Sequence, residues 1–165
     1  LIAPKMAFGT GHHSTTFMIL NWMTDQNFRG QSVLDFGCGT GILGIYAKKK
    51  ECQKLVMVDI EEQAIENSKE NAKLNNVIID SIFLGSVVQV KGMKFDLILA
   101  NITRNILQET LPTLSSLLNS KGLIIVSGFL IQDKEFMEQL LKNNGLTPKE
   151  TFTDKDWVSI LASNN

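Results

Sequence analysis

The stretch SVLDFGCGTGILG, residues 32–44, joins a short apolar run to a turn that contains four glycines. An apolar run that stops at an acidic residue or a glycine is typical of a buried strand in a parallel sheet. The glycines permit a tight turn and let a ligand lie against backbone amides at the start of a helix. The stretch therefore predicts a strand, a ligand-binding turn and a helix in direct succession.

The rest of the chain repeats this alternation of apolar runs and helical patterns. More buried strands are predicted at residues 54–59, 82–84, 95–100 and 122–128. Helical patterns are predicted at residues 61–75, 104–119 and 133–144, with Asp133 as a cap and Gly145 as a stop. Two edge strands are predicted in residues 149–163. The fold class is α/β, with a doubly wound, mostly parallel, seven-stranded sheet and an antiparallel strand near the C-terminus.

The composition indicates one domain over residues 1–165, because 44% of the residues are hydrophobic and 20% are charged. A formal charge of −1 provides no bulk attraction for a phosphate backbone, so duplex nucleic acid is not an expected partner. Cys38 and Cys52 lie too far apart for a CxxC unit, and no signal peptide or membrane-spanning run is visible. We therefore expect a cytoplasmic protein with reduced thiols and no membrane partner.

The glycine turn limits the ligand but does not identify it. Residues 39–44 satisfy the GxGxxG pattern of dinucleotide-binding domains, which leaves a NAD enzyme open. Asp35 lies two residues before Gly37, where a carboxylate would repel the pyrophosphate of NAD but attract the ammonium of S-adenosylmethionine. The carboxylate of that cofactor would then use the amides around Gly39 and Gly41. A turn that binds no ligand remains the alternative.

Two further polar residues end strands of the predicted sheet. Asp59 ends the second strand, 24 residues after Asp35, at the spacing where an acid meets a ribose diol in nucleoside-binding domains; helix capping is its alternative role. Asn101 ends the fourth strand, which lies next to the first across the switch point of the sheet. Its amide oxygen is suited to accept a hydrogen bond from a substrate amine, and turn formation is the alternative.

The adjacent pair His12 and His13 suggests a metal site, but the pattern argues against one. Neighbouring side chains on an extended segment point to opposite sides, and neither cysteine has ligand spacing to the pair. We therefore expect no bound metal, and we expect His13 to be a contact or a hydrogen-bonded hinge.

The motifs DFGCGTG at residues 35–41, Asp59 and Ala100-Asn101-Ile102, in this order, resemble a Rossmann-like class I S-adenosylmethionine-dependent methyltransferase. With AFGTGHHSTT at residues 7–16, the chain resembles one bacterial family, the methyltransferases of large-subunit ribosomal protein eleven, called PrmA. The resemblance covers essentially the whole chain.

The resemblance implies roles for individual residues. Phe8 and Thr10 would belong to a flap that closes over the cofactor and leads into a helix capped by Ser14. Thr16 would lie against the cofactor, Gly37 would belong to its methionine-side loop, Asp59 would take the ribose, and Asn101 would line the methyl-transfer site. Many relatives carry an acid after the third strand, near the adenine, but this chain has Ser86 there. The adenine contact is therefore left open.

The implied reaction is transfer of a methyl group from S-adenosylmethionine to lysine or N-terminal amines of the ribosomal protein, without a metal. Family members usually carry an N-terminal recognition domain, which the resemblance implies is absent from this chain, so we expect weak methylation by the isolated domain. Another protein or a small-molecule amine is the alternative substrate, and a non-catalytic nucleoside-binding module is a second alternative. Base-methylating relatives show Pro-Pro after Asn or Asp, whereas Asn101 precedes Ile102-Thr103, which favours a protein substrate.

Overall fold

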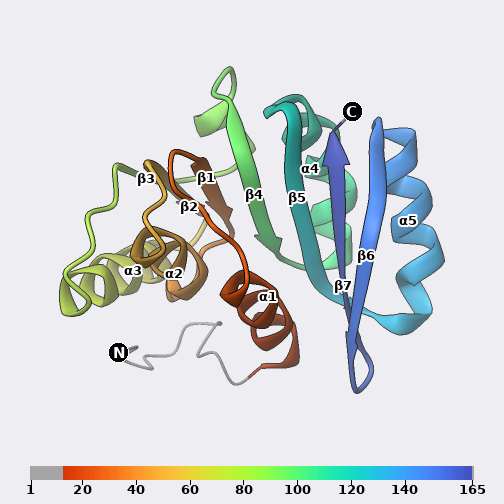
Figure 1. Ribbon diagram of the computed structural model, residues 1–165, viewed down its shortest axis with the longest axis horizontal. Helices are drawn as coiled ribbons and strands as arrows, with labels where there is room; N and C mark the ends of the chain where they lie inside the picture. The colour runs from red at the N-terminus through yellow and green to blue at the C-terminus, as the bar shows by residue number, and fades with distance from the viewer. Residues whose placement is uncertain (1–12, 165) are drawn as a thin grey trace.

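The structure, a computed structural model, describes residues 13–164. Its core is a seven-stranded sheet in the order β3-β2-β1-β4-β5-β7-β6 (Figure 1). The strands are β1 (Ser32–Phe36), β2 (Lys54–Asp59), β3 (Ser81–Leu84), β4 (Phe95–Asn101), β5 (Leu118–Leu130), β6 (Leu146–Asp154) and β7 (Trp157–Asn164). Strands β1 to β5 pair in parallel, whereas β7 runs antiparallel to both β5 and β6. The predicted fold class is confirmed.

Five α-helices and two 3-10 turns connect the strands. They are α1 (Ser14–Thr24), α2 (Ile42–Lys49), α3 (Glu62–Leu74), η1 (Val87–Val90), α4 (Arg104–Ser116), η2 (Ile131–Asp133) and α5 (Lys134–Asn143). No helix in this described part is long and apolar enough to span a membrane.

A helix end and a helix cap differ from the sequence prediction. The helix predicted to reach residue 119 ends at Ser116, and β5 begins at Leu118, because Leu118 is buried and pairs with Phe95 of β4. Asp133 occupies the N-cap position of α5, but its side chain makes no capping hydrogen bond. Its carboxylate pairs instead with Arg104 at 2.7 Å.

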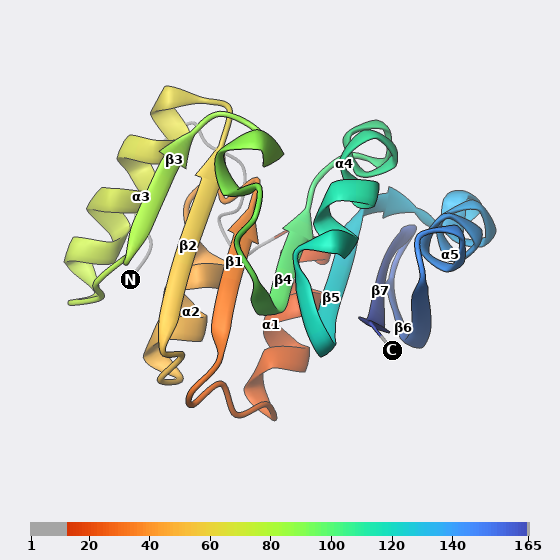
Figure 2. The same cartoon turned by 90° about the horizontal axis from the view of Figure 1, so that it is seen from above.

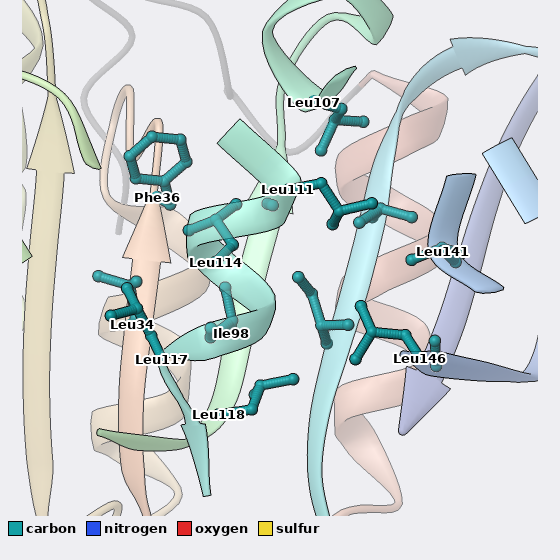
Figure 3. Packing of buried hydrophobic residues seen from close by; sticks show 14 of the residues in the cluster. Leu34, Phe36, Ile98, Leu107, Leu111, Leu114, Leu117, Leu118, Leu141 and Leu146 are labelled. Atoms are coloured by element: carbon teal, nitrogen blue, oxygen red, sulfur yellow. The ribbon is translucent and has the colours of Figure 1, made fainter. Parts of the chain in front are cut away.

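Helices cover both faces of the sheet (Figure 2). On one face, buried residues of α1, α2 and α3, such as Ile19, Leu43 and Ala72, form one apolar cluster with the sheet. On the other face, α4 and α5 form a second cluster, in which Leu107, Leu111 and Leu114 project from one side of α4 (Figure 3). Full burial of each such leucine contributes about 1.5–3 kcal/mol.

This packing brings the ends of three strands together. The strand order reverses at β1, which has β2 on one side and β4 on the other. In open sheets of this kind, ligands bind outside the carboxyl ends of the strands at that point. The turn after β1, Asp59 at the end of β2 and Asn101 at the end of β4 all lie there.

Candidate functional site

The turn after β1 is a glycine loop whose backbone only glycine adopts easily. Gly37, Gly39 and Gly41 have φ values of 74°, 55° and 76°, in the left-handed region that costs other L-residues roughly 1–2 kcal/mol. The N–H groups of Gly37 and Cys38 donate to the carbonyl of Val58 at 2.8 and 3.1 Å. These bonds fasten the loop to the end of β2.

Asp59 ties the same loop to the end of β2 through its carboxylate. Its Oδ2 accepts a hydrogen bond from the N–H of Gly39 at 2.9 Å, and its Oδ1 accepts one from the N–H of Glu61 at 3.0 Å. Each carboxylate oxygen has a second lone pair, and the side chain is only partly buried. The carboxylate is thus oriented and can still accept hydrogen bonds from a ligand.

Asp35 is almost completely buried, with 2% of its surface exposed. Its Oδ2 accepts a hydrogen bond from the N–H of Gly44 at 2.8 Å, which satisfies an amide in the first turn of α2, where Gly41 gives no side-chain cap. Burial raises the pKa of Asp35 to about 7, against the effect of the Gly44 hydrogen bond and with a smaller contribution from the Asp59 charge. The sequence did not indicate this bond, and the predicted contact with a ligand stays a prediction.

Asn101 lies beside α1. Its Nδ2 donates a hydrogen bond to the hydroxyl of Thr16 at 3.1 Å, and Thr16 is 1% exposed. Its Oδ1 is buried and has no hydrogen-bond partner within residues 13–164. An unpaired buried acceptor costs about 1–3 kcal/mol, which is typical of a site where a ligand supplies the donor.

Ile102 fills the space between the glycine loop and the end of β5. A Cβ on Gly37 would lie 2.2 Å from Cγ2 of Ile102, and a Cβ on Gly128 would lie 2.3 Å from the Ile102 carbonyl oxygen. Gly128 has a φ of 97°, and the Ile102 N–H donates to the Ser127 carbonyl at 3.1 Å. These contacts fix the backbone that follows Asn101, and sequence reasoning missed the role of Gly128.

His13 caps α1, so the predicted cap at Ser14 is wrong: Ser14 is already the first residue of the helix. The Nδ1 of His13 accepts from the N–H of Thr15 at 3.4 Å and lies 2.8 Å from the Thr15 hydroxyl. The imidazole also packs edge-on against Trp157, with ring centroids 4.7 Å apart and planes at 69°. Phe8 and Thr10, predicted to close over a cofactor, lie outside the described residues.

The end of β3 carries no acid. The Gly85 N–H donates to the Asp59 carbonyl at 2.8 Å, which places this turn beside the end of β2. Ser86 is the N-cap of η1, and its N–H donates to Oε1 of Gln89 at 2.8 Å in a capping box. The polar groups here are therefore neutral.

Neither the Cys38 thiol nor a cluster of metal ligands provides a reactive group in the described residues. The Cys38 thiol lies 3.4 Å from the Ser68 hydroxyl, and burial raises its pKa, which disfavours the nucleophilic thiolate. Among residues 13–164 no three His, Cys, Asp or Glu side chains gather to hold a metal ion. The groups that converge at this end of the sheet are the glycine loop, the Asp59 carboxylate and an amide oxygen without a partner in residues 13–164, which fit a nucleoside that carries an amino acid group.

Comparisons with known proteins agree with this geometry. The family model described as ribosomal protein L11 methyltransferase (PrmA) matches residues 1–165. A ribosomal protein L11 methyltransferase of Porphyromonas gingivalis is 38% identical over 161 residues, which are 97% of this chain and 56% of that protein. The chain spans 56–58% of the length of three such curated relatives.

Solved structures show the same fold. The crystal structure of a ribosomal protein L11 methylase from Lactobacillus delbrueckii subsp. bulgaricus superposes with a TM-score of 0.91 at 30% identity, covering 99% of this chain and 84% of that one. A magnesium protoporphyrin IX methyltransferase from Synechocystis, solved with bound S-adenosylmethionine, has a TM-score of 0.74 at 19% identity and covers 92% of this chain and 78% of that one. At this identity the second likeness concerns the fold alone.

Proposed function

The chain belongs to the ribosomal protein L11 methyltransferase family, and we propose that residues 1–165 form a domain that transfers a methyl group from S-adenosylmethionine to amines of a ribosomal protein. One observation carries this proposal: the Oδ1 of Asn101, buried and without a hydrogen-bond partner among residues 13–164, lies at the same end of the sheet as the glycine loop and Asp59. An acceptor without a partner is what a methyl-accepting amine requires beside a bound cofactor. A ribosomal protein substrate also supports a cytoplasmic location.

Different residues bind different parts of the cofactor in this proposal. The free lone pairs of Asp59 receive the two ribose hydroxyls, while the loop of Gly37, Gly39 and Gly41 lets the methionine part approach the backbone. Asp35, whose pKa of about 7 leaves its carboxyl partly protonated at neutral pH, holds the first turn of α2 through the Gly44 hydrogen bond. Thr16 of α1 holds the Asn101 side chain by a hydrogen bond.

Methyl transfer needs a neutral amine that points at the electrophile. S-Adenosylmethionine, when bound, supplies a methyl carbon on a sulfonium, and this carbon needs no further activation. A lysine amine has a pKa of about 10.4 and must lose a proton first, which a desolvated site promotes by disfavouring the charged form. Asn101 Oδ1 then accepts one N–H of the amine and directs its lone pair at the methyl carbon.

The targets that this mechanism favours are lysine side chains and an N-terminal amine of ribosomal protein L11. The names of the relatives support the protein substrate. Nothing in the described site resembles a stacking platform for a flipped base next to Asn101, where Ile102 packs against Gly37 instead.

Calorimetric titration with S-adenosylmethionine and, separately, with NAD tests the proposal. We expect one-to-one binding of S-adenosylmethionine, a loss of more than about tenfold in affinity in Asp59→Ala, and no binding of NAD. Asp25→Ala, which removes an exposed carboxylate at the end of α1, is the control and keeps wild-type affinity. Tighter binding of NAD than of S-adenosylmethionine would contradict the proposal.

A second assay addresses the substrate. Labelled methyl transfer from S-adenosylmethionine to ribosomal protein L11 is expected to fall sharply but to stay measurable in Asn101→Ala, while the affinity for the cofactor changes much less. Methylation of RNA in preference to the protein would count against a protein substrate.

A further inference from the structure

We propose that Thr16 is a positioning residue: its hydroxyl fixes the orientation of the Asn101 carboxamide, so that the amide oxygen, not the amide nitrogen, faces the methyl-accepting amine. This inference rests on the proposed function. The sequence predicts a contact between Thr16 and the cofactor, and the orientation of Asn101 is a second, separate role of Thr16.

The contacts define the orientation. Nδ2 of Asn101 lies 3.1 Å from the Thr16 hydroxyl oxygen, and Oδ1 is buried without a partner within the described residues. A carboxamide is planar, so the direction of one end determines the direction of the other. With Nδ2 held at α1, Oδ1 is the only group that the amide can offer on its other side.

This choice has a chemical consequence. An amide oxygen accepts an N–H of the attacking amine and leaves the nitrogen lone pair free. An amide nitrogen in the same place would donate to that lone pair and lower its nucleophilicity. In the orientation that the structure shows, Nδ2 donates to the Thr16 hydroxyl, and Oδ1 is the group left for the amine.

The hydroxyl itself is held in place by the start of α1. The helix is capped by His13, whose ring packs against Trp157 of β7. One turn further along, Met18 Sδ lies 4.0 Å from the Ser159 hydroxyl, also on β7. The first turn of α1 is thus fixed to the strand next to β5, and Thr16, 1% exposed, has little freedom to move away from Asn101.

Nuclear magnetic resonance of the 165-residue chain tests the orientation without any cofactor. The side-chain amide signal of Asn101 is assigned by its loss in Asn101→Ala. In Thr16→Val, which keeps the side-chain shape but removes the acceptor, this signal is expected to shift and to exchange with solvent several-fold faster. Thr16→Ser is expected to restore the wild-type signal.

Thr110→Val is the matched control. Thr110 is also a buried helix threonine, but its hydroxyl donates to the Ile106 carbonyl of its own helix, at 2.7 Å. This variant is expected to leave the Asn101 signal unchanged. An Asn101 signal that is equally unaffected by Thr16→Val would overturn the proposal.

A double-mutant cycle then separates positioning from direct cofactor binding. In Thr16→Val, kcat for methylation of ribosomal protein L11 is expected to fall about tenfold to a hundredfold, with the affinity for S-adenosylmethionine within about threefold of wild type. In the Asn101→Ala background, Thr16→Val is expected to add no further loss. A loss of S-adenosylmethionine affinity that is equal in both backgrounds would show that Thr16 acts on the cofactor alone.

The two proposals fail in different ways. If the wild-type chain does not bind S-adenosylmethionine, the proposed function fails, and the resonance experiment still decides whether Thr16 orients Asn101. If the cofactor binds but Thr16→Val leaves the Asn101 side-chain amide signal unchanged, only the positioning role of Thr16 fails.

Discussion

At the scale of single residues, the site depends on two glycines, Gly37 and Gly128, because neither has a Cβ atom. Gly37 and Gly128 both face Ile102, and a Cβ at either position would lie within 2.3 Å of an Ile102 atom. Ile102 follows Asn101 directly, so a displacement of Ile102 would move the residue on which methyl transfer is proposed to depend.

Gly37→Ala is expected to lower the affinity for S-adenosylmethionine by more than tenfold. The substitution adds roughly 1–2 kcal/mol of backbone strain and pushes the new Cβ against Ile102. Gly30→Ala separates the two effects, because Gly30 has a similar φ of 78° but no atom within 4 Å of its Cβ position. The control is expected to cost stability alone, and Ile102→Ala is expected to restore part of the affinity of Gly37→Ala. Equal affinities of the two glycine variants in calorimetry would refute the steric argument.

The buried carboxyl of Asp35 makes stability depend on pH. Its folded pKa of about 7 lies above the usual aspartate value of 3.8, so the folded state binds more protons than the unfolded state between these values. The free energy of unfolding therefore falls as the pH rises from about 4 to about 7, by at most a few kcal/mol.

Asp35→Asn is expected to remove this dependence, because it keeps an oxygen for the Gly44 N–H but cannot ionise. The free energy of unfolding of Asp35→Asn relative to that of the wild type therefore increases as the pH rises. The buried Nδ2 of the variant costs about 1–3 kcal/mol at every pH. Urea unfolding at several pH values between 4 and 8 provides the comparison. Parallel curves for the two proteins would mean that Asp35 is ionised throughout.

At the scale of elements, sequence periodicity located the strands and most helices but not the contacts that fix their ends. Asp59 and Asn101 could be placed at strand ends because each closes an apolar run. The bond between Asn101 and Thr16 joins residues 85 positions apart, and no local pattern encodes it. The same holds for the Asp133 carboxylate, which leaves its own helix to pair with Arg104.

The start of α1 shows the same limit and leads to a prediction. Ser14 has the residue type of a good cap, but His13 takes the position because its ring can cap the helix and contact Trp157 at once. His13→Ala is expected to cost roughly 1–3 kcal/mol, the sum of a lost cap and a lost aromatic contact.

His13→Asn is the informative companion, since asparagine is a good cap that lacks the ring. It is expected to recover about half of the loss in chemical denaturation. If it is no more stable than His13→Ala, the capping bond contributes little and the contact with Trp157 dominates.

At the scale of the whole molecule, the end of the sheet opposite the proposed binding site has its own polar cluster around Asp96. At the amino ends of the strands, Asp96 accepts hydrogen bonds from the N–H and hydroxyl of Ser32, both at 2.8 Å, and from Asn119 at 2.7 Å. Partial burial acts to raise the pKa of Asp96, but these hydrogen bonds outweigh it and lower the pKa overall. The stability that Asp96 contributes is thus present above about pH 4 and lost as the pH falls below it.

Asp96→Ala is expected to lower the free energy of unfolding by about 1–3 kcal/mol and to leave the affinity for S-adenosylmethionine unchanged. Asp59→Ala is expected to lower the affinity for S-adenosylmethionine as well as the stability, because its carboxylate also accepts two backbone hydrogen bonds. Urea unfolding and calorimetry on both variants form the test. A large loss of cofactor affinity in Asp96→Ala would show that the two ends of the sheet are coupled.

The position of β7 has a consequence for biosynthesis. This strand comes last along the described chain, yet it lies between β5 and β6. While the polypeptide emerges from the ribosome, β5 has an unpaired edge and β6 has no neighbour in the sheet until residues 157–164 follow. Open edges of this kind invite pairing with other chains. The nascent protein is therefore most exposed to aggregation just before its synthesis reaches β7, and a chaperone would be needed most during that interval.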